Sequence, residues 1–201
     1  MMPRKVTTIA KKKKKSSGAL VLIIILVCVG IAVTGIIILA MPSQPSPGAV
    51  LAEHAAIDLY DLLEEVLAID LEEGYPQTPE EVVQLFNSTF RILYGWDRSD
   101  VYMISRVLEI QRGLYAQALL ELNPFQQQLS MLLFSLDEQY NLGLEIIGIY
   151  QGAPVFNRFS PDRCVITVIR YANNGQSFHY DIHLFQHPES GRWEIGMWVE
   201  I

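Results

Sequence analysis

The chain has 201 residues and a formal net charge of −7, but its charges are unevenly distributed. All six lysines lie in the first 15 residues, together with Arg4, whereas residues 42–201 hold eight arginines, no lysine and all 22 acidic residues. The formal charge of residues 42–201 is therefore −14. This charge argues against a nucleic-acid-binding domain, because such a surface would repel the phosphates that it must neutralise.

An apolar run, Ala19–Met41, follows a block of five lysines, Lys11–Lys15, and has Thr34 as its only polar side chain. As a helix it would be about 34 Å long, slightly more than the roughly 30 Å of a bilayer's hydrocarbon core. The positive-inside rule keeps the basic tail in the cytoplasm. The sequence therefore predicts a single-pass protein of the cell membrane, with an extracytoplasmic C-terminal domain and a lysine block that contacts membrane lipid.

The apolar run is too long for the core of a cleaved signal peptide. Val27 also stands before Cys28, where a lipoprotein site needs a small residue. We therefore expect a permanent anchor and four regions. These are a basic cytoplasmic tail over 1–18, a transmembrane helix over 19–41, a Pro/Ser linker over 42–48 and an extracytoplasmic domain over 49–201.

The first part of residues 49–201 is expected to form three to four helices. Apolar residues recur at helical spacing from Ile57 to Leu67. Thr78 followed by Pro79 and Glu81 is typical of a capped helix start, and this helix should end near Gly95. Two more helices are expected over 99–120 and from Asn123-Pro124 to Gly143.

The second part is rich in strand-forming residues. Strands are expected at about 145–156, 163–172, 177–187 and 192–201. The turns Asn173–Gly175 and Pro188–Gly191 join the last three strands, which favours an antiparallel meander. Helices followed by strands are typical of an α+β domain.

The hairpin, the aliphatic strand and the closing segment Gly191–Ile195 resemble the nuclear-transport-factor-two-like, or cystatin-like, superfold. This resemblance implies a four-stranded antiparallel sheet that curves around the helices to form a cone. In that superfold an isomerase-type or cyclase-type site would lie deep inside the cone.

Four stretches also resemble a family of uncharacterised, N-terminally membrane-anchored proteins of Gram-positive bacteria: Asp70–Val83, Arg112–Tyr115, Leu119-Leu120 and Asn123-Pro124. The resemblance covers most of residues 49–201. It implies an anchored extracytoplasmic domain of unknown function and assigns no catalytic residue.

Alternating polar residues suggest one possible metal site. His179, Asp181 and His183, with His187 further along, share one face of a predicted strand and could ligate a metal ion. A solvated strand face is the simpler interpretation, because the opposite face is apolar and suits the core. That opposite face consists of Phe178, Tyr180, Ile182 and Leu184.

Other candidates have equally simple structural interpretations. Tyr150, Tyr171 and Asp181 could serve in acid–base chemistry if they lined a pocket. Cys164 is expected to be a small buried hydrophobic residue. The acid-rich stretch 58–81 is expected to be a solvated helix face, with docking of a basic partner as the alternative.

The sequence therefore assigns no catalytic, cofactor-binding or metal-binding residue. It favours a non-catalytic binding or interaction domain whose partner is an envelope protein. Two alternatives stay open: a scaffold component of a secretion or conjugation apparatus, and a small-ligand receptor or isomerase-type enzyme that uses the cone pocket.

Overall fold

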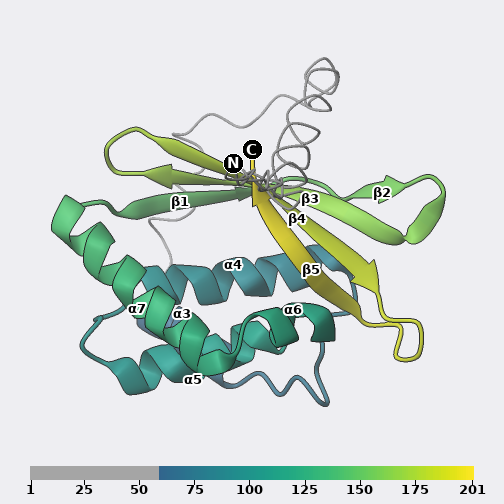
Figure 1. The fold of residues 1–201 in the computed structure, drawn as a ribbon, viewed down its shortest axis with the longest axis horizontal. Helices are drawn as coiled ribbons and strands as arrows, with labels where there is room; N and C mark the ends of the chain where they lie inside the picture. The colour runs from purple at the N-terminus through teal and green to yellow at the C-terminus, as the bar shows by residue number, and fades with distance from the viewer. Residues whose placement is uncertain (1–58) are drawn as a thin grey trace, which may run out of the picture. The chain divides into compact units, whose positions relative to one another are not determined.

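A computed structural model describes residues 59–201, which form five helices followed by five strands (Figure 1). The helices are α3 (Leu59–Leu67), α4 (Pro79–Gly95), α5 (Val101–Arg112), α6 (Gln117–Leu122) and α7 (Phe125–Leu142). The strands are β1 (Ile146–Gln151), β2 (Val155–Asn157), β3 (Ser160–Ala172), β4 (Ser177–Gln186) and β5 (Trp193–Glu200).

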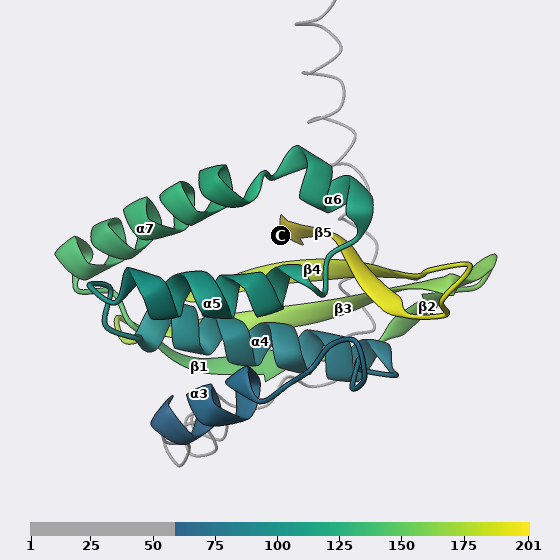
Figure 2. The same cartoon turned by 90° about the horizontal axis from the view of Figure 1, so that it is seen from below.

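The strands form one antiparallel sheet in the order β1-β3-β4-β5, and the short β2 also pairs with β3. The long strand β3 thus lies beside β1 and β2 on one side and β4 on the other. All five helices lie on the same side of the sheet, and α4 makes most of the contacts with it (Figures 1 and 2). Side chains alternate between the faces of a strand, so only every second residue of β3 and β4 faces the helices.

The core lies between this face and α4. Val82, Val83 and Leu93 of α4 are at most 2% exposed, as are Ile166 of β3 and Ile182 of β4. Truncating one such aliphatic side chain to alanine typically costs about 2–5 kcal/mol. The packing of α4 on the sheet therefore holds the two layers together.

The start of α4 is defined by local chemistry, as the sequence predicts. The backbone N–H of Glu81 donates to the hydroxyl of Thr78 (3.2 Å), and the Glu81 carboxylate accepts from the backbone N–H of Thr78 (3.1 Å). Pro79 occupies the first turn, where its missing N–H has no intrahelical partner to lose. The pKa of Glu81 is lowered, first by the hydrogen bond that its carboxylate accepts from the backbone N–H of Gln77 (2.8 Å) and then by the one from Thr78.

The connection between α5 and α6 is tied to the last strand. The backbone N–H of Ile195 donates to the carbonyl of Leu114 (2.8 Å), and the N–H of Ala116 donates to the carbonyl of Ile195 (2.9 Å). Tyr115 thereby forms a parallel bridge with Ile195. This pairing positions the Tyr115 side chain between the helices and the sheet.

Helix α7 is held by one buried residue, by partly buried apolar side chains such as Leu129, Leu132 and Leu133, and by polar contacts. Leu136 is its only buried residue. The guanidinium of Arg98 forms an ion pair with Asp137 (2.9 Å) and lies 3.6 Å from the ring centroid of Tyr140. The helix ends at Gly143, whose positive φ of 60° suits a residue without a Cβ.

The α+β class, the helix-first order and the antiparallel meander β3-β4-β5 are as predicted, but the expected element counts are wrong. The structure has five helices instead of three to four, because the expected third helix ends at Arg112 and the chain then pairs with β5 before α6 begins. It has five strands instead of four, because Gly152 and Pro154 interrupt the expected first strand. Asn123 ends α6 rather than capping α7.

The expectation of a transmembrane helix also needs correction for the part of the chain that the structure describes. Within residues 59–201, no helix has both the length and the apolar character needed to cross a bilayer. Even α7, with 18 residues, carries four glutamines and two acids along its length. The tail (1–18), the predicted span (19–41) and the linker (42–48) lie outside the described residues.

Candidate functional site

A pocket of about 340 Å³ opens between α4, α5 and α7 on one side and the helix-facing side of the sheet on the other. Its lining combines two kinds of side chain. The apolar side chains are those of Phe86, Phe90, Leu93, Leu108, Met131, Leu132 and Trp198. The polar side chains are those of Tyr94, Gln111, Tyr115, Asn123, Gln128, Ser135, Arg170 and Tyr180.

Arg170 is the one charged residue of this lining. It lies on β3 opposite Phe178 of β4 and Ile149 of β1, at a position that faces the helices. Only 8% of its surface is exposed. A charged side chain at a core-facing strand position is unusual, because burying an unpaired charge is costly.

Two aromatic rings lie close to the Arg170 guanidinium. Its central carbon lies 3.4 Å from the ring centroid of Phe90 and 4.5 Å from that of Tyr180. Phe90 in turn stacks on Tyr94, with ring centroids 4.2 Å apart. The rings stabilise the cation electrostatically, but they do not neutralise it.

No carboxylate of residues 59–201 forms an ion pair with Arg170, and its Nε has no hydrogen-bond partner there. Burial lowers the pKa of Arg170 from its usual value of 12.5 to about 10, against the raising influence of Tyr180 and Tyr94. The guanidinium therefore remains positively charged at neutral pH. The pocket thus contains a buried cation with an unsatisfied donor.

A hydrogen-bonded network forms the polar wall of the pocket. The hydroxyl of Tyr115 donates to Gln111 Oε1 (3.0 Å), and Gln111 Nε2 donates to the hydroxyl of Thr89 (3.0 Å). Gln128 of α7 donates to the Tyr115 hydroxyl (3.5 Å) and accepts from Arg112. The network connects α4, α5 and α7 and holds the Tyr115 side chain in place.

The pocket chemistry suits binding better than catalysis. No Asp, Glu or His is among its lining residues within the described chain. Burial raises the pKa of Tyr115 and that of Tyr180, so both phenols stay protonated at neutral pH. They can donate or accept hydrogen bonds, but they are poor general bases.

The alternating histidines lie on the sheet face away from this pocket. Asp181 accepts a hydrogen bond from the hydroxyl of Thr167 (2.7 Å), and His179 pairs with Ser177 (3.1 Å). His187 accepts from two backbone N–H groups in the turn that follows β4. Over residues 59–201 no three His, Cys, Asp or Glu side chains come close enough together to hold a metal ion.

The other sequence candidates also lie elsewhere. Tyr150 and Tyr171 occupy positions on the same face as the histidines, by their register with Ile169 and Gly148. Cys164 is a free, buried thiol whose pKa burial raises to about 11, as expected of a small core residue. The structure therefore brings none of these residues to the pocket.

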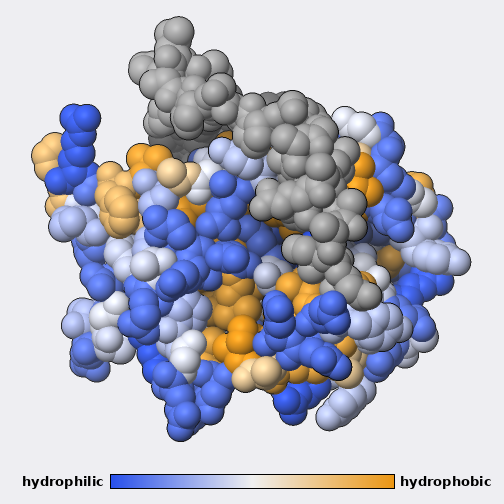
Figure 3. Space-filling model, turned by 180° about the vertical axis from the view of Figure 1, so that it is seen from behind, coloured by the Kyte–Doolittle hydropathy of each residue, from blue (hydrophilic) through white to orange (hydrophobic). Residues whose placement is uncertain are grey.

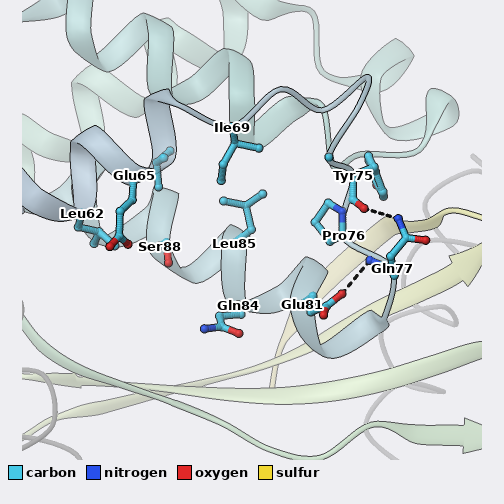
Figure 4. A pocket seen from close by; sticks show the side chains of 12 residues that line it. Leu62, Glu65, Ile69, Tyr75, Pro76, Gln77, Glu81, Gln84, Leu85 and Ser88 are labelled. Carbon is cyan, nitrogen blue, oxygen red and sulfur yellow. Dashed lines mark hydrogen bonds between the residues drawn. The ribbon is translucent and has the colours of Figure 1, made fainter.

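The acid-rich stretch is largely solvated and borders a second pocket of about 400 Å³ (Figure 4). Two of its polar lining side chains have structural partners: Gln77 Nε2 donates to the Tyr75 carbonyl (2.5 Å), and Glu81 caps α4. Tyr75 itself donates to the Trp193 carbonyl (2.8 Å). The surface seen from behind is mostly hydrophilic around a patch of apolar side chains (Figure 3).

A third hollow, of about 640 Å³, lies beside β2 and β5. Exposed apolar side chains such as Val155, Phe156 and Met197 line much of it. It contains no buried polar atom without a partner among the described residues. The pocket at Arg170 is therefore the strongest candidate site.

Arg170, Tyr115 and Tyr94 are site residues that the sequence alone does not indicate. The sequence does place Tyr180 on the core face of its strand, and the burial of Ile182 and Leu184 on that face confirms this orientation. One signal was available for Arg170. It interrupts the aliphatic alternation of Ile166 and Val168 at the next inward-facing position.

Comparisons with known proteins found no match among curated proteins and none among solved structures. The resemblances to the cystatin-like superfold and to anchored proteins of Gram-positive bacteria therefore stay predictions. One family does match, over residues 10–198, which is nearly the whole chain. The chain belongs to the family described as "Domain of unknown function (DUF6715)".

Proposed function

We propose that the folded domain is a non-catalytic receptor that binds a small, partly apolar molecule in the pocket at Arg170. The observation that carries this proposal is the pocket's composition, in which aromatic and aliphatic side chains enclose polar groups of which only Arg170 is charged. Ligand sites are typically concave, mostly apolar and equipped with a small number of polar groups that orient the ligand. This function corresponds to the small-ligand alternative of the sequence analysis.

The proposal is non-catalytic for a chemical reason. Proton transfer at neutral pH needs a group whose pKa lies near 7. The titratable groups that line the pocket are an arginine and tyrosines, and burial moves the pKa of Tyr115 and that of Tyr180 further above neutrality. These groups support recognition and orientation of a ligand.

The test is a thermal-shift screen of the full-length chain against a library of small polar and amphipathic molecules. A ligand at 100 times its dissociation constant should stabilise the protein by about 2.7 kcal/mol. The variant Leu132→Trp fills the pocket and should lose the shift. The matched control Phe134→Trp changes a side chain of α7 that is 65% exposed, and it should keep the shift.

Two results would count against a pocket receptor. One is a library in which no compound stabilises the wild type. The other is a set of hits whose stabilisation is unchanged in Leu132→Trp, because binding would then occur outside this pocket.

We also propose, from the sequence, that the protein resides at the cell membrane with its N-terminus in the cytoplasm and that it meets an envelope partner there. The lysine block Lys11–Lys15 and the apolar residues 19–41 support this location. Protease treatment of intact cells should digest residues 59–201. Digestion only after lysis would contradict the orientation.

A further inference from the structure

The charge of Arg170 lacks a counter-charge among the described residues. The side chain is 8% exposed, no carboxylate pairs with it, and its Nε hydrogen has no acceptor. A buried unpaired cation destabilises a fold, so its presence in a pocket needs a reason. An anionic ligand would supply both the missing charge and the missing acceptor.

The two aromatic rings beside Arg170 restrict where such a ligand can bind. Phe90 lies against the guanidinium at 3.4 Å and Tyr180 lies at 4.5 Å, each measured from ring centroid to Cζ. The Nε–H group, which lies in the guanidinium plane, has no partner among the described residues, so a ligand would bind at this edge of the guanidinium. A planar carboxylate fits such an edge with two parallel hydrogen bonds.

The charge balance of the pocket indicates a single negative charge. Arg170 is its only lining cation. The nearby Arg112 is already engaged, since it donates to the carbonyl of Asn123 (2.6 Å) and to Gln128. A phosphate dianion would leave one charge unmatched, whereas a monocarboxylate would be neutralised.

The remaining walls indicate the character of the rest of the ligand. Leu132 and Met131 of α7 and Leu93 of α4 line the same pocket. These side chains suit an aliphatic or aromatic group and offer no hydrogen bonds to a sugar or peptide. The hydroxyls of Tyr94 and Ser135 lie 3.2 Å apart on the helical side of the pocket and could form a hydrogen bond with the ligand there.

We propose that the ligand is a largely apolar monocarboxylate whose carboxylate binds the in-plane edge of Arg170. This inference rests on the proposed receptor function and names the class of molecule that the same pocket would take. It makes Arg170 the residue that decides specificity, with Phe90 and Tyr180 as the residues that orient it.

The test uses two matched pairs of probes with the full-length chain: hexanoate with hexanamide, and phenylacetate with phenylacetamide. Each pair has nearly the same shape and differs in charge. Binding is followed by NMR, through the Nε–Hε signal of Arg170 and by titration of the pocket resonances. We expect the carboxylates to bind about tenfold or more tightly than the amides and to shift the Arg170 signal.

The variant Arg170→Met keeps the length and apolar stem of the side chain but removes the charge. It should bind the carboxylate and the amide of each pair with equal, weak affinity. Arg163→Met, an exposed arginine of the same strand, is the matched control and should keep the carboxylate preference.

The outcomes separate this inference from the receptor function. Equal binding of acids and amides to the wild type, or a carboxylate preference that survives in Arg170→Met, overturns the carboxylate assignment while the receptor function stands. Failure of all four probes to bind also overturns it. The receptor function itself fails only if the library screen yields no ligand that depends on the pocket.

Discussion

Arg170 shows how a single residue can work against the stability of the fold that holds it. Desolvation of its guanidinium is only partly offset by the stacked rings of Phe90 and Tyr180. Core positions of this kind normally carry aliphatic residues. The two preceding inward-facing positions of the same strand do so, with Ile166 and Val168. A buried charge without a counter-charge is typical of a binding site, where stability is given up for function.

Because the buried guanidinium is desolvated, we expect Arg170→Met to make the ligand-free protein more stable. Methionine fills the space without a buried charge, and we expect the free energy of unfolding to rise by about 1 kcal/mol. Urea denaturation at pH 7 measures it, with Arg163→Met as a control that should change stability by less than about 0.5 kcal/mol. A clear loss of stability in Arg170→Met would mean that stacking on the two rings outweighs desolvation.

The buried phenols predict the response of the fold to alkali. Burial, with a smaller contribution from Glu194, raises the pKa of Tyr75 from 10.0 to about 12, and burial also raises the pKa of Tyr115. A raised pKa in the folded state means that the stabilisation is complete below about pH 10 and is lost as the pH rises towards 12. Unfolding should therefore become easier from about pH 10 upwards.

The variant Tyr75→Phe tests this pH dependence. It removes the titrating group and the hydrogen bond to the Trp193 carbonyl, so it should lose about 1 kcal/mol at pH 7 but lose less additional stability above pH 10. Denaturation curves from pH 7 to 12 provide the measurement. Tyr102→Phe, at a position that is 70% exposed, should follow the wild-type curve.

At the scale of the element, α4 and α7 are held in different ways. Helix α4 buries ten residues and packs on α3, α5 and the sheet, whereas α7 buries only Leu136. The other attachments of α7 are partly buried apolar side chains, such as Leu129 and Leu133, and polar contacts. Among the polar contacts is the Arg98–Asp137 ion pair, whose side chains are 37% and 66% exposed. Exposed ion pairs contribute little to stability.

This difference predicts unequal hydrogen exchange. Amides of α7 should exchange through local opening about tenfold or more faster than those of α4, because fewer buried contacts must break. Hydrogen-exchange mass spectrometry of the ligand-free full-length chain measures this difference directly. Equal protection of the two helices would show that α7 opens only with the whole domain.

At the scale of the whole molecule, the local signals in the sequence predicted most elements. The capping residues at Thr78 and Glu81 located the start of α4, and the turns ending at Gly175 and Gly191 located the boundaries of the last three strands. These features depend on a few neighbouring residues, which a sequence displays directly. The positive φ angles of the two glycines and the capping hydrogen bonds of Thr78 and Glu81 each suit only a few residue types.

The remaining features depend on residues far apart in the chain. The sequence could not show that the expected third helix stops at Arg112, because its end is set by pairing of Leu114 and Ala116 with Ile195. The pocket was missed for the same reason. Phe90 lies on α4 and Arg170 on β3, far apart in the sequence, and only the packing of α4 on the sheet brings them together.

That pairing has a consequence for how the chain is made. Leu114, Tyr115 and Ala116 leave the ribosome long before Ile195, whose backbone completes their hydrogen bonds. Trp198, which also lines the pocket, emerges later still. A nascent chain can form α4 and α5 early, but it closes the site only after Ile195 and Trp198 have emerged, so deleting β5 removes the site before it removes the helices.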